Sequence, residues 1–210
     1  MSQTDGDIAQ FFATTLYRAR LGDDDGDAFL DELRLVCRTF EAEDDAGQEW
    51  AARAGYKGYT SYGSIDDLAE QSPVIAELCV RLKPHLIAFA KAVDFDLRGL
   101  TPEVDSIWIN VLEHGGVHTG HIHANSVISG TVYVEVPDDA SQIRFEDPRA
   151  AMMLAAPPRA ADAQAHNRAF VSVQPEAGDV LLWESWLRHD VPFNGSEDDR
   201  ISISFNAVLV

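Results

Sequence analysis

Beyond Leu100 the sequence consists of short runs of β-branched and aromatic residues, each bounded by Gly, Pro, Asn or Asp. The runs occupy residues 106–114, 127–136, 141–147, 169–175, 179–185 and 200–210. Several strands in close succession, without helical crossovers between them, are typical of a β-sandwich or a barrel. The stretch from Arg149 to Arg168 is rich in Ala and Pro and is predicted to be an insertion loop between two strands.

The first half of the chain has a helical pattern instead. After Asp27, apolar residues recur at three- and four-residue spacings and predict an amphipathic helix: Phe29, Leu33, Val36 and Phe40. A second helix is predicted over residues 72–93, with a serine N-cap and a proline in its first turn. Pro84 is expected to kink or break it. We therefore expect a single α+β domain, 1–210, in which 1–100 is a mainly helical support and 101–210 the β core.

Charge limits the partners of the chain. Its 210 residues include 16 Lys and Arg against 35 Asp and Glu, a formal net charge of −19. A strongly acidic surface repels the phosphate backbone, so no nucleic-acid partner is expected. Cys37 and Cys79 lie too far apart in sequence to form a Cys-x-x-Cys motif, and they indicate a reducing compartment. Because the sequence has neither a signal-peptide pattern nor an apolar run of membrane-spanning length, we expect a cytoplasmic protein without a membrane partner.

Five of the seven histidines fall in the β half: His114, His118, His121, His123 and His189. On a strand, His121 and His123 would point to the same face, within reach of one metal ion. Imidazole is the commonest neutral metal ligand in proteins. A His-x-His pair also occurs often among solvated loop histidines, so the pair alone indicates a metal site only weakly.

The last predicted strand has two chemically distinct faces. Arg200, Ser202, Ser204 and Asn206 share one face, and Ile201, Ile203 and Phe205 share the other. Ordinary alternation, with the polar face toward water, explains this pattern. The alternative is that Arg200 and Ser202 form a carboxylate anchor, because a guanidinium fork that cannot deprotonate lies beside a hydroxyl two residues along.

Taken together, His121-x-His123, His189 and Arg200-x-Ser202 resemble the site of the iron(II)- and 2-oxoglutarate-dependent oxygenases. More narrowly, segments 121–137, 144–149, 175–191 and 200–206 look like an uncharacterised bacterial and phage branch of that superfamily. The resemblance covers most of residues 104–210, and a weaker match extends to 12–21 and 58–64. It implies a double-stranded β-helix, a jelly-roll barrel buttressed on one outer face by the N-terminal helices.

The resemblance also implies roles for individual residues. His121 and His189 match the two histidines of the iron-binding triad, and His123 occupies the position where most of the superfamily has Asp or Glu. A third imidazole there would leave the metal centre one positive charge richer. His118 is the rival third ligand.

Arg200 and Ser202 match the pair that holds the distal carboxylate of 2-oxoglutarate. Tyr133 and Asn110 could also hydrogen-bond this cosubstrate, although each could equally be a buried polar residue satisfied within the barrel. Trp183 and Trp186 flank the approach to His189 and could wall a pocket or pack in the core. The 149–168 loop is expected to lie over the barrel mouth.

The implied function is an iron(II)- and 2-oxoglutarate-dependent dioxygenase. It would use O2 to hydroxylate a small-molecule or protein substrate and would decarboxylate 2-oxoglutarate to succinate. Two alternatives remain at this point: a three-histidine, cupin-type dioxygenase or isomerase that uses no oxoacid, and a non-catalytic jelly-roll binding module. Neither the primary substrate nor the oligomeric state follows from the sequence.

Overall fold

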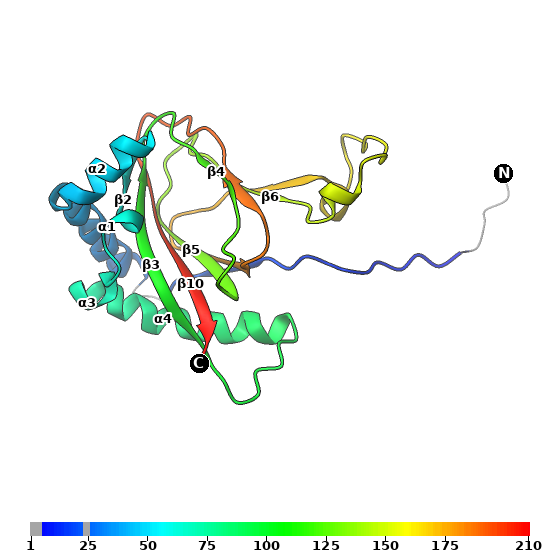
Figure 1. The fold of residues 1–210 in the computed structure, drawn as a ribbon, viewed down its shortest axis with the longest axis horizontal. Coiled ribbons are helices and arrows are strands. Elements are labelled where there is room, and N and C mark those ends of the chain that lie inside the picture. Colours follow the sequence, from blue (N-terminus) through cyan, green and yellow to red (C-terminus); the bar gives the residue numbers. More distant parts are fainter. Residues whose placement is uncertain (1–5, 23–25) are drawn as a thin grey trace.

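The computed structural model describes residues 6–22 and 26–210, which form two antiparallel sheets with helices on the outer side of the larger sheet (Figure 1). Mixed helices and antiparallel strands confirm the predicted α+β class. No strand of one sheet pairs with a strand of the other within these residues, so the sheets face each other without closing into a hydrogen-bonded barrel. The protein is thus an open, double-sheet version of the predicted architecture.

Four α-helices lie in the first half of the chain: α1 (Gly26–Glu43), α2 (Asp45–Ala54), α3 (Leu68–Gln71) and α4 (Pro73–Ala92). Helix α4 begins as predicted, because the Ser72 side chain accepts a hydrogen bond from the N–H of Ile75. The alternative of a break at Pro84 is wrong, since α4 continues through it. Proline removes the bond to the carbonyl of Val80, but Val80 is 67% exposed and water can satisfy that carbonyl.

The larger sheet has the strand order β1-β8-β5-β10-β3-β2. Its strands are β1 (Tyr17–Arg20), β2 (Gly58–Thr60), β3 (Pro102–Leu112), β5 (Ile128–Glu135), β8 (Asp179–Glu184) and β10 (Arg200–Leu209). Both edge strands, β1 and β2, come from the part of the chain predicted to be mainly helical. They were not predicted, because runs of three and four residues carry too little periodicity to identify a strand.

The smaller sheet has the order β4-β9-β6-β7. It is built from β4 (His118–His121), β9 (His189–Val191), β6 (Ile143–Glu146) and β7 (Phe170–Val173). Strands β6 and β7 form a hairpin that projects away from the helices and carries the predicted insertion loop at its far end (Figure 1). Two 3-10 turns, Ala150–Met152 and Ala165–Asn167, lie within that loop.

Strand β10 separates the two halves of the interior. Ile201, Ile203 and Phe205 belong to the large core formed with α1 and α4. The opposite face, which carries Arg200 and Ser202, is buried as well, and it faces the smaller sheet. Of the two interpretations of this strand, ordinary alternation with the polar face in bulk water is therefore wrong, because a second sheet covers that face.

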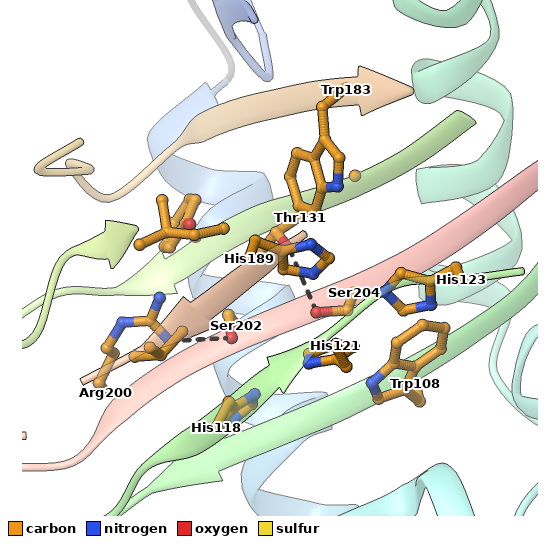
Figure 2. A pocket seen from close by; sticks show the side chains of 14 residues that line it. Trp108, His118, His121, His123, Thr131, Trp183, His189, Arg200, Ser202 and Ser204 are labelled. Atoms are coloured by element: carbon orange, nitrogen blue, oxygen red, sulfur yellow. Dashed lines mark hydrogen bonds between the residues drawn. The ribbon is translucent and has the colours of Figure 1, made fainter. Parts of the chain in front are cut away.

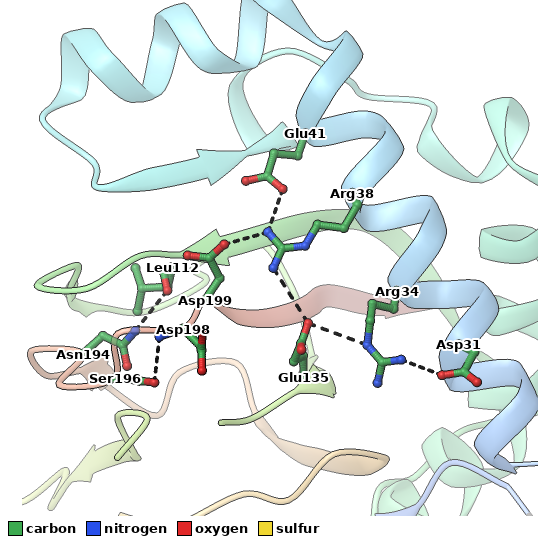
Figure 3. A network of polar contacts seen from close by, with 10 residues as sticks. All are labelled: Asp31, Arg34, Arg38, Glu41, Leu112, Glu135, Asn194, Ser196, Asp198 and Asp199. Carbon is green, nitrogen blue, oxygen red and sulfur yellow. Dashed lines mark hydrogen bonds and ion pairs between the residues drawn. The ribbon is translucent and has the colours of Figure 1, made fainter. Parts of the chain in front are cut away.

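Helix α1 is attached to the ends of β5 and β10 by an ionic network (Figure 3). Arg38 lies 2.7 Å from the carboxylate of Asp199 and 3.8 Å from that of Glu135, and Arg34 lies 3.6 Å from the same Glu135 carboxylate. Asp199 directly precedes Arg200, and Glu135 lies two residues beyond Tyr133. The network therefore holds the strand ends that carry these two pocket side chains.

No helix among the described residues is both long and apolar enough to cross a bilayer.

Candidate metal centre and anion pocket

Three histidines converge between the two sheets. Strands β4 and β9 pair so that His121 lies directly opposite His189, and His123 follows two residues after β4 ends. One ring nitrogen from each of the three lies within 4.8 Å of the other two. His121 and His123 are thus brought together as the sequence predicted, although β4 ends at His121 and only the first of the pair lies on a strand.

Hydrogen bonds fix which nitrogen two of these rings can offer to a metal. The Nδ1 atom of His121 lies 2.7 Å from the carbonyl oxygen of Thr119, and Nδ1 of His189 lies 2.9 Å from that of Leu187. A carbonyl oxygen only accepts, so in each ring Nδ1 carries the hydrogen. The Nε2 lone pairs are consequently left free, which is the arrangement that a metal-binding imidazole requires.

His123 is held by its backbone and by its neighbours. Its N–H donates to the carbonyl of Ser185 at 3.0 Å. Its ring stacks on that of His189 at 5.3 Å between centroids and an angle of 15°, and Trp108 lies on its other side at 5.9 Å. These contacts limit the rotation of the ring toward solvent and place it at the edge of the cluster (Figure 2).

Burial keeps two of the three rings neutral. Burial, together with the unfavourable effect of a second positive charge on the neighbouring rings, lowers the pKa of His189 to about 3 and that of His123 to about 4. Neutral imidazole is the form that binds a metal ion. The donor set of three imidazoles suits iron, zinc, copper or nickel better than magnesium or calcium.

A buried arginine lies at the other end of the pocket (Figure 2). Arg200 is only 2% exposed, and its guanidinium lies over the ring of Tyr133, 4.9 Å from the centroid. Its NH1 group reaches the hydroxyl of Ser202 at 3.4 Å, while its Nε has no hydrogen-bond partner. Among the described residues no carboxylate lies within ion-pair distance of this guanidinium.

Two more buried donors in this pocket have no partner. The hydroxyl of Tyr133, on a fully buried side chain, and the indole N–H of Trp183 make no hydrogen bond in the described part of the chain. Trp183 packs edge-on against His189 at 4.7 Å. Since buried polar groups normally find partners, an unpaired guanidinium and unpaired donors around one pocket indicate that an anionic ligand belongs there.

Asn110 forms its hydrogen bonds within the protein. Its side chain accepts a hydrogen bond from the hydroxyl of Thr60 at 3.0 Å and donates to that of Ser204 at 3.2 Å. Asn110 does not line the pocket, whereas Ser204 does. Asn110 therefore has the role of a polar residue that is satisfied within the protein, and its contact with the cosubstrate stays a prediction.

His118, the rival third ligand, lines the pocket but lies outside the three-histidine cluster. Its Nε2 lies 2.7 Å from the hydroxyl of Tyr56. The sequence analysis missed Tyr56, which has no motif around it and is 62 residues from its partner. Tyr133, Trp183, Arg200 and Ser202 all line the same pocket, as was predicted or weighed for each.

The centre of a water-sized sphere can occupy about 50 Å³ within the pocket. No residue of the 149–168 loop lines it. That loop lies instead beside the N-terminal segment, where His166 contacts Gln10 at 2.7 Å between nitrogens. The predicted position of the loop over the mouth of the site is therefore wrong. Trp186, also considered as a pocket wall, is 47% exposed and does not line the pocket.

Comparisons with known proteins agree with this geometry. Residues 106–206 match a family model described as "Putative 2OG-Fe(II) oxygenase", and this segment contains the three histidines, Arg200 and Ser202. The comparison with curated proteins finds no match.

Solved structures share the fold at low sequence identity. The non-heme alpha ketoglutarate dependent epimerase SnoN from nogalamycin biosynthesis has a TM-score of 0.61 and 15% identity, covering 93% of this chain and 78% of that one. A prolyl-4-hydroxylase from Pseudomonas putida has a TM-score of 0.54 and 14% identity over 93% of this chain and 89% of its own. HygX from Streptomyces hygroscopicus, solved with iron bound, has a TM-score of 0.57 and 14% identity, covering 93% of this chain and 82% of that one. These likenesses confirm the predicted jelly-roll fold.

Proposed function

We propose that His121, His123 and His189 bind iron(II) and that Arg200 and Ser202 anchor 2-oxoglutarate, because residues 106–206 match the model of a 2OG-Fe(II) oxygenase family. Enzymes of this family are oxidoreductases that use iron(II), 2-oxoglutarate and O2. The reaction proposed for this chain is the hydroxylation of a C–H bond in its substrate, with decarboxylation of 2-oxoglutarate to succinate.

The observation that carries this proposal is the pairing of a three-histidine cluster with an unpaired buried guanidinium in one pocket. Three imidazoles alone would suit many metal sites. Arg200 distinguishes this one, because a guanidinium that is 2% exposed and has no carboxylate beside it requires an anion from outside the chain. A dicarboxylate that reaches from the metal to Arg200 meets both requirements.

Each part of the pocket then has a task. The Nδ1–H bonds of His121 and His189 hold the rings so that Nε2 faces the metal. Trp183 and Tyr133 form a largely apolar wall that excludes water, and their unpaired N–H and O–H groups are available to the bound anion. When bound, iron supplies the oxidising chemistry, and the protein supplies orientation and a dry environment.

Proteins of similar fold support an oxidation as the reaction of this chain, although they differ in the product that they form. Two structural neighbours are an epimerase, SnoN, and a carbocyclase, SnoK, both alpha ketoglutarate dependent, and a third is a prolyl-4-hydroxylase. We take hydroxylation as the reaction of this chain because it is the simplest outcome. The net charge of −19 disfavours nucleic acids and anionic metabolites, so we expect a neutral or cationic small molecule or protein segment as substrate.

The cupin-type alternative, a three-histidine enzyme without an oxoacid, leaves the buried Arg200 without a function. A non-catalytic binding module leaves the three-histidine cluster without one.

One anaerobic experiment separates the three possibilities. Iron(II) and then 2-oxoglutarate are added to the metal-free protein, and the weak visible metal-to-ligand charge-transfer band is recorded. The proposed function requires the band. Iron binding without the band would favour the cupin-type reading, and no iron binding at all would favour the binding module. The Arg200→Ala variant serves as the matched control, because it should bind iron but show the band only at higher 2-oxoglutarate concentrations.

A further inference from the structure

A tyrosine–histidine pair lies at the arginine end of the pocket. The hydroxyl of Tyr56 is 2.7 Å from Nε2 of His118, and the two rings lie 5.3 Å apart. Figure 2 shows His118 at the same end of the pocket as Arg200 and Ser202, whereas His123 and Trp108 lie at the opposite end. The pair therefore lies on the arginine side of the pocket, close to the place proposed for the distal carboxylate, with His118 three residues before His121 on β4.

The end of helix α2 places Tyr56. Gly55 takes a left-handed conformation, with φ of 68°, and the N–H of Tyr56 then donates to the carbonyl of Ala51 at 2.9 Å. This is a common way for a helix to end, and it fixes the direction in which the next side chain leaves. Tyr56 is thus held in position by backbone geometry before it meets His118.

When Tyr56 is the donor, the hydrogen bond between the two side chains sets the tautomer of His118. Burial raises the pKa of Tyr56 above its usual range, so the phenol keeps its proton and can donate it. An imidazole nitrogen without hydrogen is the acceptor, which leaves Nδ1 of His118 as the N–H group. Among the described residues this Nδ1 has no hydrogen-bond partner, while the ring lines the pocket.

The neighbours of His118 favour an anion. Burial, and after it the charge of nearby Arg200, lowers the pKa of His118 to about 3, so the imidazole is a neutral donor at physiological pH. The Tyr133 hydroxyl in the same pocket is also an unpaired donor. A carboxylate has about four acceptor sites, of which a bidentate guanidinium fills two and the Ser202 hydroxyl one, so a further donor can still bind.

We infer that His118 is a further binding residue for 2-oxoglutarate, and that Tyr56 is the positioning residue that holds its Nδ1–H toward the distal carboxylate. This inference rests on the proposed function and deepens it. His118 thereby acts on the cosubstrate and not as an iron ligand. The pair makes the arginine end of the pocket selective for an oxoacid that carries a second carboxylate.

The test compares two oxoacids in anaerobic titrations of the iron-loaded protein. The first is 2-oxoglutarate, and the second is 2-oxobutanoate, which keeps the keto acid but lacks the distal carboxylate. His118→Leu should weaken 2-oxoglutarate binding by about 10- to 100-fold, the usual worth of a hydrogen bond to a charged group. Tyr56→Phe should weaken it by about tenfold or less, because the tautomer is then no longer enforced. Binding of 2-oxobutanoate and iron content should not change.

The chain provides a matched control and a rescue variant. Tyr17 and His85 form a second tyrosine–histidine pair, 2.9 Å apart and outside the pocket, so Tyr17→Phe should leave both affinities unchanged. His118→Asn keeps an N–H near the position of Nδ1 and should recover most of the loss seen in His118→Leu.

Equal losses for the two oxoacids, or no loss in His118→Leu, would overturn the inference while the proposed function stands. An iron-loaded wild-type protein that binds no 2-oxoglutarate would instead contradict the proposed function itself. Thermal unfolding of each variant identifies any that fail to fold, and the comparison of Asn with Leu at position 118 does not depend on the Tyr56 variant.

Discussion

A histidine binds a metal through one ring nitrogen, and in two of the three rings of this site a backbone carbonyl decides which nitrogen that is. His121→Ala and His189→Ala each remove one Nε2 donor, and the two remaining imidazoles cannot hold the ion tightly. We expect each variant to lose stoichiometric iron while remaining folded. The measurement is metal content after dialysis, with circular dichroism to verify the fold.

His123 provides the control for this prediction. His123→Asp replaces the imidazole by the carboxylate that is commoner in the superfamily, so iron should be retained if position 123 contributes a ligand. Undiminished iron in His121→Ala or His189→Ala would remove that residue from the ligand set. His114, which lies outside the cluster, can be changed to Ala as a variant that should not affect iron.

Arg200 is expected to act on the cosubstrate and not on the metal. Arg200→Ala should weaken 2-oxoglutarate binding by ~2–5 kcal/mol, as loss of one partner from a desolvated charge pair generally does. Arg200→Lys keeps the charge but loses the two-pronged geometry, so it should also bind more weakly than the parent. Anaerobic titration gives the affinity, and iron content should survive both changes. An unchanged affinity of Arg200→Ala for 2-oxoglutarate would contradict the anchor role of Arg200 and favour the cupin-type enzyme.

The lowered pKa values predict how pH affects the metal-free protein. His118, His123 and His189 have folded-state pKa values of about 3, 4 and 3, below the unfolded value of about 6.5. Between these limits the unfolded chain binds more protons, so the free energy of unfolding must fall as the pH falls below about 6.5. The slope is at most about 1.4 kcal/mol per pH unit for each histidine.

Denaturant unfolding at about pH 7 and pH 5 measures this effect, with a chelator present and enough salt to screen the acidic surface. Carboxylates titrate mainly below this interval, so histidines dominate the change. The His118→Asn variant should show a smaller loss between the two values. A free energy of unfolding that does not change over this range would contradict the burial of neutral imidazoles.

At the level of secondary-structure elements, α1 and the central strands are held together by apolar packing and by the network of Figure 3. Arg38→Ala removes contacts to Asp199, Glu41 and Glu135 at once. Because these side chains are partly exposed, we expect a loss of only about 1 kcal/mol in the free energy of unfolding, decreasing with added salt. Arg98→Ala, which removes a single exposed pair with Asp96, should have less effect. A loss in Arg38→Ala that does not depend on salt would argue against an ionic contribution.

At the level of the whole molecule, the two halves of the chain share one core. Helices α1 and α4 bury their apolar faces against β10 and its neighbours, and β1 and β2 complete the larger sheet from the helical half. A fragment of residues 101–210 would expose this apolar face and lose both edge strands. We expect it to be insoluble or unfolded, as judged by circular dichroism, whereas the 1–210 chain should unfold in a single transition. A folded fragment that binds iron would show that the β half is an independent domain.

The sequence by itself determined the class of the fold and most of the chemistry. Local periodicity identified the two long helices and the longer strands, because a buried face repeats every 3.6 or two residues whatever lies opposite to it. His121-x-His123, His189 and Arg200-x-Ser202 predicted the site only through the resemblance of the whole array to the 2OG-Fe(II) oxygenases, because each part by itself is common.

Only the tertiary structure decided which of these residues are paired and which are left free. The unpaired state of Arg200, the occupied amide of Asn110 and the bond between Tyr56 and His118 all depend on contacts between segments distant in sequence. Short strands such as β4 and β9 likewise exist only because their partners hydrogen-bond to them. The sequence around a polar residue does not show which distant residue will form a hydrogen bond with it. Which polar groups are satisfied, and therefore which remain to bind a ligand, is consequently a property of the folded chain.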